Sequence, residues 1–330
     1  MNLTEEHQEA SCVHSNVSCL GTSGDVLLYM AAAVVVTVTV CGNLLVIISI
    51  CHFKQLQTPT NFVLLSLAMA DFLVGVIVMP LYFTVLINSQ RCFDILYCTM
   101  FHLAGFYLTC LSIYNVTLIA VDRYLALSNP FHYSMKVTVN VTLRIIAILW
   151  LYSLIYNVVL LYYNGNITDM KANITCGECF VKVNTVWAIV DLIIVFVLPC
   201  SIIIFIYLNI FAIAKKHANK IRSVRKCPKV NNSNMASERK AAKTLGVLVA
   251  VFLLCLVPYY VSAFIEVYFR NRSVHVAVSV TLTLIYLNSS INPIIYALFY
   301  PWFQRSFKII ITLKICRTES SVLHVLAQET

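Results

Sequence analysis

Seven apolar stretches, each long enough to cross a lipid bilayer, constrain this chain more than any other feature of its sequence. A membrane-spanning helix needs about 20 mostly apolar residues. The stretches are Val26–Cys51, Phe62–Leu86, Ile95–Leu125, Leu143–Tyr163, Val183–Ala214, Thr244–Phe269 and Val276–Phe299. A composition of 60% hydrophobic and 11% charged residues, with a mean hydropathy of +0.84, excludes a soluble globular domain. We therefore predict an all-α membrane protein, a seven-transmembrane-helix bundle.

The spans divide the chain into three predicted parts. Residues 1–25 form an extracellular N-terminus, 26–299 the transmembrane domain, and 300–330 a short cytoplasmic amphipathic eighth helix with a C-terminal tail. The segment from Met1 to Asp25 is polar and lacks the apolar core of a cleavable signal peptide. We expect the first spanning helix to insert as its own signal anchor.

The basic residues are sorted by side of the membrane. With the N-terminus outside, eighteen of the 23 lysines and arginines fall on the inner side, ten of them between Lys215 and Lys243. Positively charged loops remain in the cytoplasm. This pattern predicts a multi-pass plasma-membrane protein with an extracellular N-terminus. The net charge of +9 thus reflects topology and contact with membrane lipid, and we expect no nucleic-acid partner.

The last spanning stretch ends in an unusual motif, NSSINPIIYALFYPWF, from Asn288 to Phe303. An Asn-Pro pair inside an apolar helix breaks backbone hydrogen bonds, which is tolerated where neighbouring polar groups recapture them. The run resembles the seventh helix of rhodopsin-like G-protein-coupled receptors and, more narrowly, the signature of trace amine-associated receptors. The fixed positions that it matches are Asn288, Ser289, Asn292, Pro293, Tyr296, Tyr300, Trp302 and Phe303. The wider resemblance covers about Asp25 to Cys316.

The resemblance implies a switch that activates a heterotrimeric G protein, with a stimulatory one as the family expectation. Asp122-Arg123-Tyr124 ends the third helix and matches the family's Asp-Arg-Tyr. Arg123 can pair with Asp122, or with Glu238 at the base of the sixth helix, and its release would open a cytoplasmic cleft. A structural salt bridge without switching is the alternative. The same machinery includes Tyr207, Asn292, Pro293 and Tyr296.

A polar pocket is implied between the second, third and seventh helices. Charged and amide side chains inside a membrane are costly and need a reason. Asp71 is the deepest acid, and the resemblance places Ser112, Asn288 and Asn292 around it. Two interpretations stay open, a bound sodium ion or a hydrogen-bonded packing node without an ion. No other cofactor and no other metal site is expected.

Six of the 13 cysteines lie on the predicted outer side, where an even number suggests disulfide bridges. The resemblance pairs Cys98 with Cys179, and it implies a second bridge from Cys176 to the N-terminus, at Cys12 or Cys19. Cys316 follows an amphipathic run and is either a palmitoyl anchor or an idle thiol. Glycosylation sequons on the outer side begin at Asn2, Asn16, Asn166, Asn173 and Asn271.

The usual ligand acid of the aminergic relatives is missing. That family carries an Asp in the third helix, eighteen residues before the Arg of Asp-Arg-Tyr, and here this position is Gly105. Asp191 in the fifth helix is an alternative, because it lies in an apolar run about 2.2 turns before Pro199, at pocket depth. Some fish trace amine receptors carry their amine-binding Asp there. A protonated or water-bound structural Asp is the competing interpretation.

Aromatic residues are expected to complete the amine pocket, because cations are attracted to ring faces. Glu266 near the outer end of the sixth helix is assigned to the vestibule, with a second cation contact as the alternative. Leu256 stands where the family usually has a Trp at the pocket floor, so a rotamer switch of that Trp is not expected here. The aromatic candidates are Trp187, Tyr259, Tyr260, Tyr286 and Phe106.

Three functional hypotheses of different classes remain. The first is a G-protein-coupled chemoreceptor for small amines, olfactory by resemblance, and the second is the same scaffold tuned to a non-amine ligand, suggested by Gly105. The third is a transporter or membrane enzyme. A transporter should show internal repeats with paired broken helices, and an enzyme a nucleophile with a base or a metal cluster. The sequence shows neither pattern, so we favour the amine receptor and expect no catalytic residues.

Overall fold

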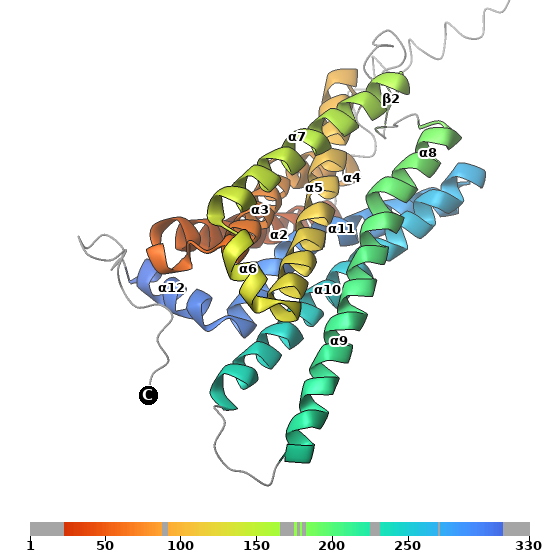
Figure 1. Cartoon of the computed structure of the whole chain (residues 1–330). Helices are drawn as coiled ribbons and strands as arrows, with labels where there is room; N and C mark the ends of the chain where they lie inside the picture. Colours follow the sequence, from red (N-terminus) through yellow and green to blue (C-terminus); the bar gives the residue numbers. More distant parts are fainter. Residues whose placement is uncertain are drawn as a thin grey trace, which may run out of the picture.

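A computed structural model of the chain describes residues 23–87, 92–165, 175–176, 179, 183–224, 232–269 and 271–312, without the side chains at 92, 95, 175–176 and 213–245. Long helices make up almost all of it and lie side by side in one bundle (Figure 1). Their bounds are α2 Ser23–His52, α3 Pro59–Leu73, α4 Met79–Ile87, α5 Ile95–Ser128, α6 Pro130–Lys136, α7 Val139–Tyr163, α8 Thr185–Asp191, α9 Leu198–Val224, α10 Asn232–Tyr268, α11 Arg272–Phe299 and α12 Pro301–Ile311.

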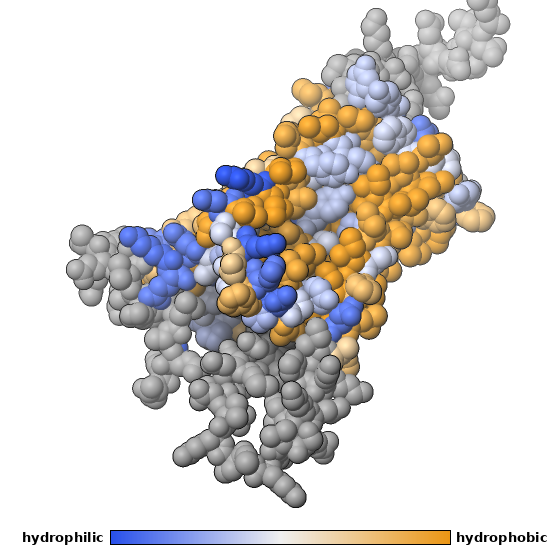
Figure 2. Space-filling model, viewed as in Figure 1, coloured by the Kyte–Doolittle hydropathy of each residue, from blue (hydrophilic) through white to orange (hydrophobic). Residues whose placement is uncertain are grey.

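The predicted seven-helix bundle is confirmed. Seven helical spans in the described residues are long and apolar enough to cross a membrane. The second span joins α3 to α4 through the π-helical segment η2 (Val74–Val78), and the fifth joins α8 to α9 through η3 (Leu192–Val197). The surface in Figure 2 is largely hydrophobic over these spans and hydrophilic near α6 and α12. This distribution fits helices that face lipid along their middle and water at their ends.

Two helices continue beyond the apolar stretches. α9 runs to Val224 and α10 begins at Asn232, whereas the apolar pattern ends near Ala214 and resumes near Thr244. The added turns are rich in Lys and Arg, which form helices well but do not enter the bilayer. A prediction based on hydropathy therefore locates the membrane-embedded part and not the helix end.

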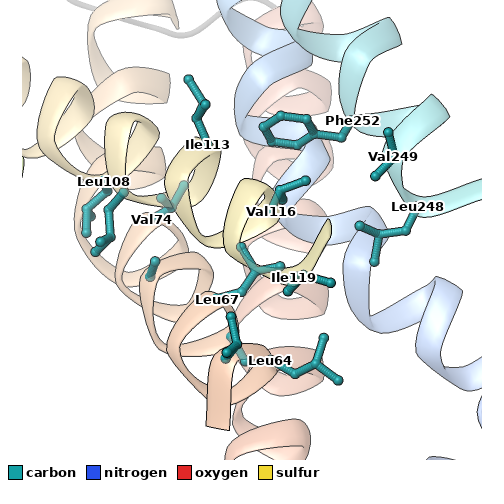
Figure 3. Close-up of a cluster of buried hydrophobic side chains, with 14 of the residues drawn as sticks. Leu64, Leu67, Val74, Leu108, Ile113, Val116, Ile119, Leu248, Val249 and Phe252 are labelled. Atoms are coloured by element: carbon teal, nitrogen blue, oxygen red, sulfur yellow. The ribbon is translucent and has the colours of Figure 1, made fainter. Parts of the chain in front are cut away.

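α5 lies at the centre of the bundle and packs on α3, α7 and α9. Figure 3 shows the buried side chains that fill the space between α3, α5 and α10. Leu67, Leu111 and Ile113 have no solvent exposure, and Val116 and Phe252 are almost as deeply buried. Side chains of α10, which carries the sixth-helix proline, therefore belong to the same buried core as those of the central helix.

The first and last spanning helices meet at a close approach of backbone to proline. A Cβ built on Gly42 would lie 2.7 Å from Cβ and 2.9 Å from Cγ of Pro293, so only glycine fits there. One residue further, Asn43 Nδ2 donates to the carbonyl oxygen of Ser289, 3.0 Å away. This amide is the kind of neighbour that a proline-interrupted helix in a membrane requires.

The outer end of the bundle is tied to α5 by a covalent bond. Cys98 and Cys179 form a disulfide with an S–S distance of 1.98 Å, as the resemblance implied. Nearby, the two-residue strands β1 (Cys92–Phe93) and β2 (Thr175–Cys176) pair antiparallel, with Cys92 opposite Cys176. Cys92 is therefore a further candidate partner for Cys176, in addition to the predicted candidates Cys12 and Cys19. Cys12 and Cys19 lie outside the described residues.

The expected eighth helix is present as α12. It follows α11 directly after Tyr300 and packs on α2 and α11. Trp302, Phe303 and Ser306 are buried while Gln304 and Phe307 are exposed, so the helix is amphipathic. Cys316 lies beyond the described residues, and its lipidation stays a prediction.

Candidate functional site

Asp191 is the last residue of α8, on the outer half of the fifth span, where it is partly buried. Its Oδ1 accepts a hydrogen bond of 3.0 Å from the hydroxyl of Tyr156 on α7. Within the part of the chain that the structure describes, Asp191 forms no ion pair. A carboxylate in a membrane without a cationic partner is costly, so Oδ2 of Asp191 has an unmet capacity for a positively charged group.

The helix next to Asp191 is not a regular α-helix, as the sequence-based estimate of 2.2 turns assumed. The π-helical segment η3 starts directly after it. A π-helical turn holds more residues than an α-helical one, which brings Phe196, five residues on, toward the side of the helix that carries Asp191. Phe196 stacks on Tyr260 of α10, with ring centroids 4.4 Å apart.

Two of the predicted aromatic residues lie near the carboxylate. Asp191 is close enough to interact electrostatically with the phenol groups of Tyr259 and Tyr260. The two rings contact each other edge to face, 5.4 Å apart. Tyr259 and Tyr260 of α10 and Phe196 of η3 thus form an aromatic wall of the site around Asp191.

Tyr286 occupies the space next to the missing third-helix acid. Gly105 is buried, and a Cβ built on it would lie 3.0 Å from Oη of Tyr286. Tyr286 also contacts Tyr82, with ring centroids 5.0 Å apart. The position where aminergic relatives place a carboxylate is thus filled by a phenol hydroxyl.

Trp187 and Phe106 each contact another aromatic ring. Trp187 stacks on Tyr163 at the outer end of α7, at 6.0 Å between centroids. Phe106 lies against His102, whose Nε2 is 2.9 Å from the carbonyl oxygen of Cys179. His102 thereby connects the pocket wall on α5 to the disulfide-bonded outer segment.

Asp71 is fully buried in α3 and is surrounded by hydrogen-bond donors. Its carboxylate accepts from Asn292 Nδ2 at 2.7 Å, from Ser289 Oγ at 2.8 Å and from Ser112 Oγ at 3.4 Å. Two of the three predicted partners, Ser112 and Asn292, therefore contact Asp71, and Ser289 donates the third hydrogen bond in place of Asn288. These contacts supply hydrogen bonds to both carboxylate oxygens of Asp71.

A cavity of about 20 Å³ lies between Asp71 and the pocket floor. Ser112, Asn288 and Ser289 supply its polar wall, and Leu256 and Phe252 are part of its apolar wall. Oδ1 of Asn288 is buried and has no protein partner in the described part of the chain. Such a space holds about one water molecule or a small ion, and oxygen ligands of this kind suit a hard cation.

On the cytoplasmic side, Arg123 pairs with the neighbouring acid. Its Nη2 is 2.5 Å from Oδ2 of Asp122, and it also hydrogen-bonds Thr60. Tyr133 of α6 donates to Oδ1 of Asp122 at 2.7 Å, and burial raises the pKa of the Tyr133 hydroxyl, which keeps it a donor at neutral pH. Thr60 and Tyr133 therefore stabilise the pair of Arg123 with Asp122, which is the first of the two pairings that the sequence left open.

Two tyrosines of the predicted switch are buried with unmet hydroxyl groups. Tyr207 and Tyr296 have no hydrogen-bond partner for Oη within the described residues. A buried unsatisfied hydroxyl costs about 1–3 kcal/mol. A rearrangement of the cytoplasmic half that supplies partners would be favoured by that amount.

Comparison with known proteins matches residues 42–296 to the family described as 7 transmembrane receptor (rhodopsin family). A zebrafish (Danio rerio) trace amine-associated receptor 13c is 38% identical, over 94% of this chain and 94% of its own length. Mouse (Mus musculus) receptor 7f is 36% identical over 99% and 92%, and rat (Rattus norvegicus) receptor 9 is 36% identical over 100% and 99%.

The chain is a trace amine-associated receptor of the rhodopsin family.

Family membership makes this receptor a transducer and not an enzyme or a transporter, so the third function is excluded. It also accounts for the seven spans and for the position of the described motifs within them. Tyr124 follows Arg123 at the end of α5 and is partly buried. Trp150 of α7 donates to Ser66 Oγ at 2.9 Å and joins the fourth span to the second.

Several predictions for this trace amine-associated receptor fall outside the described residues. The lock between Arg123 and Glu238 depends on a side chain that the structure does not describe. The predicted glycosylation positions Asn2, Asn16, Asn166 and Asn173 are not described either. Asn271 is exposed at the start of α11, where its side chain accepts a hydrogen bond from the backbone of Val274.

Three hydrogen-bond partners of the functional acids were not predicted from the sequence. Tyr156 holds Asp191, and Thr60 and Tyr133 hold Asp122. No local signal marks these residues, because each contact joins different helices. A tyrosine in the same half of a neighbouring span was the only available hint, and several tyrosines qualify.

Proposed function

We propose that this receptor binds a small amine through Asp191 and transmits the signal to a heterotrimeric G protein. The carrying observation is the carboxylate of Asp191, which lies inside the outer half of the bundle with one oxygen hydrogen-bonded to Tyr156 and no cationic partner among the described residues. An ammonium group supplies the missing charge. The names of the relatives agree with this ligand class.

The surroundings of Asp191 support a cation with an organic body. Tyr259 and Tyr260 of α10 and Phe196 of η3 present aromatic surface near Asp191. Cations over ring faces gain about 0.5–2 kcal/mol each, more when desolvated. The carboxylate would fix the ammonium while the rings surround the carbon atoms next to it.

The remaining assignments rest on family resemblance. We assign an olfactory role and a stimulatory, cAMP-raising G protein. For Asp71 the residues present fit a sodium ion, because Ser112, Asn288 and Ser289 add oxygen ligands beside a cavity of suitable size. The ion would stabilise one arrangement of α3, α5 and α11, and removing sodium would test this through the receptor's basal signalling.

The test of the amine site compares wild type with Asp191→Asn in cells. The panel contains trimethylamine, isopentylamine, 2-phenylethylamine and cadaverine, with isopentanol and 2-phenylethanol as uncharged counterparts. Cyclic AMP is measured together with calcium release and inhibition of forskolin-stimulated cAMP, so that any coupling subtype is seen. Removing one member of a buried charge pair costs about 3–5 kcal/mol, which is two to three orders of magnitude in EC50 or more.

We expect at least one amine to activate the wild type while its alcohol counterpart does not. Asp191→Asn should abolish that response at amine concentrations that saturate the wild type, and Asp191→Glu should retain a weaker one. Asp94→Asn is the matched control, because Asp94 is an exposed cap at the start of α5 that Asn can replace. An unchanged amine response in well-expressed Asp191→Asn would exclude the site. Activation by the alcohols alone would favour the non-amine alternative.

A further inference from the structure

The hydroxyl of Tyr156 is a fixed neighbour of the proposed ligand carboxylate. It donates to Oδ1 of Asp191 over 3.0 Å and connects the fourth span to the fifth. Tyr156 is partly buried and its ring stacks on Tyr152, one helical turn away, at 6.2 Å. A phenol hydroxyl in a membrane is costly unless it is hydrogen-bonded. The bond therefore constrains both side chains.

A second tyrosine fixes the backbone directly beyond Asp191. Tyr114 of α5 donates from its hydroxyl to the carbonyl oxygen of Ile194 at 3.2 Å. Ile194 lies in η3, the π-helical segment that begins at the residue after Asp191. Inserted turns of this kind alter the hydrogen bonding of the helix backbone and are frequent at functional sites. Tyr114 thus secures the irregular turn, and Tyr156 secures the side chain above it.

These two contacts leave one defined oxygen for a ligand. Oδ1 of Asp191 accepts from Tyr156, whereas Oδ2 has no hydrogen bond within the described residues. A carboxylate that is already oriented loses less conformational freedom when an ammonium binds. Without the Tyr156 hydroxyl, the Asp191 side chain could rotate in the free receptor. Binding of the ammonium would then cost more conformational entropy, and the affinity would fall.

We propose that Tyr156 is a positioning residue of the amine site: its hydroxyl orients the Asp191 carboxylate so that Oδ2 faces the ligand ammonium. Tyr114 supports it by anchoring the helical turn below. The inference rests on the proposed function, because it assigns a role to Tyr156 only through Asp191. Tyr156 itself does not need to touch the ligand.

Tyr156→Phe removes only the hydroxyl and keeps the ring that stacks on Tyr152. The probe is the panel amine with the lowest wild-type EC50, and wild-type receptor is titrated to the same surface density as each variant. A hydrogen bond to a charged group corresponds to roughly a ten- to hundredfold change in binding. We expect Tyr156→Phe to raise the EC50 by that factor and to leave the maximum response intact.

Tyr162→Phe is the matched control. It removes a hydroxyl from the same helix, on a side chain that is 53% exposed and does not hydrogen-bond Asp191. Changes at such positions are usually small, so its EC50 should stay within about threefold of wild type. Tyr114→Phe is a second variant that should raise the EC50, because it frees the carbonyl of Ile194.

A double-mutant cycle separates positioning from a general structural role. If Tyr156 acts through the carboxylate of Asp191, its loss should matter less in the Asp191→Glu background, where the carboxylate is displaced by one methylene. Contacting residues show such non-additive effects, whereas independent sites add. An equal fold-change in both backgrounds would overturn the positioning role.

The outcomes also distinguish this inference from the proposed function. If Asp191→Asn abolishes the amine response while Tyr156→Phe and Tyr114→Phe both match Tyr162→Phe, the amine site stands and the positioning role is wrong. If Asp191→Asn responds like wild type, or no panel amine activates the wild type, both proposals fail together. A selective loss of potency in Tyr156→Phe supports both.

Discussion

Tyr286 lies where a side chain at position 105 would project, which explains how this pocket differs from that of aminergic relatives. A Cβ on Gly105 would come within 3.0 Å of the Tyr286 hydroxyl. A carboxylate at this position would therefore compete with the phenol for space. With the acid at Asp191 instead of in the third span, Tyr286 stays in place and the proposed ammonium contact lies on the fifth span.

This geometry predicts what is needed to move the acid back. Asp191→Ala with Gly105→Asp places a carboxylate against the Tyr286 hydroxyl, and overpacking of this kind costs about 1–3 kcal/mol. Adding Tyr286→Phe removes the obstructing atom. We expect the triple variant to respond to amines with an EC50 at least about tenfold below that of the double variant.

The measurement is a cAMP dose-response in cells with equal surface receptor. Tyr286→Phe in the wild-type background is measured alongside, so that the contribution of the hydroxyl itself can be divided out. A double variant as potent as the triple one would show that the Tyr286 hydroxyl does not obstruct position 105.

At the residue scale, the sequence identified the acids and the partners that belong to a motif, such as Asn292 for Asp71 and Arg123 for Asp122, but no partner for Asp191. Asp191, Asp71 and Asp122 stand out because a charge in an apolar run is costly wherever the helix packs. Tyr156 does not stand out, since its role depends on a contact with a residue 35 positions away on another helix. Similarly, helical spacing did not reveal that the ring of Trp187 stacks on Tyr163 of a neighbouring helix.

The π-helical segments are the main departure at the scale of elements. Hydropathy located all seven spans, because the requirement for about 20 apolar residues is strict. It could not locate η2 and η3, since Val, Ile and Leu fill α-helical and π-helical turns alike. The segment η3 changes which residues share a face with Asp191, so a small error in helix phase becomes an error in the predicted pocket wall.

Packing of α2 against α11 provides a test at the same scale. Gly42→Ala would drive a methyl group into the rigid ring of Pro293, with 2.7 Å between the two Cβ atoms. Because the ring cannot turn away, the helices must separate and lose the contact of Asn43 with Ser289. We expect less receptor at the cell surface and a lower melting temperature after purification.

Gly246→Ala is the control for this substitution. It makes the same change within α10, where the nearest atom to the new Cβ is 4.0 Å away on Tyr207. That distance is an ordinary van der Waals contact, and Ala favours helix over Gly by about 1 kcal/mol. Equal surface levels and melting temperatures for the two variants would show that the Gly42 contact is dispensable.

For the whole molecule, the outer site and the cytoplasmic switch are linked through the central helix. α5 carries Gly105 next to the pocket, Ser112 at the Asp71 site and Arg123 at the inner end. α10 packs mainly on α11, and it carries both Tyr260 near Asp191 and Phe252, which lines the same cavity as Ser112 of α5. A ligand that draws α8 and α10 together around Asp191 would therefore act on α10, whose Phe252 lies in the buried core shown in Figure 3.

The inner end of this pathway can be tested at Arg123. In the structure Arg123 is held by Asp122 and Thr60, with Tyr133 on the other carboxylate oxygen. Its side chain is 33% exposed on the cytoplasmic side, so it can leave this network and meet a G protein without unfolding a helix. We expect Arg123→Ala to abolish amine-driven signalling while most receptor still reaches the surface.

Arg144→Ala is the matched control for this prediction. Arg144 is an exposed basic residue near the cytoplasmic start of α7, so its replacement removes the same charge without touching the Asp122 network. Surface labelling and cAMP are measured on the same cells at saturating amine. If Arg123→Ala signalled as strongly as Arg144→Ala, the network around Asp122 would be a structural salt bridge and the receptor would couple through other residues.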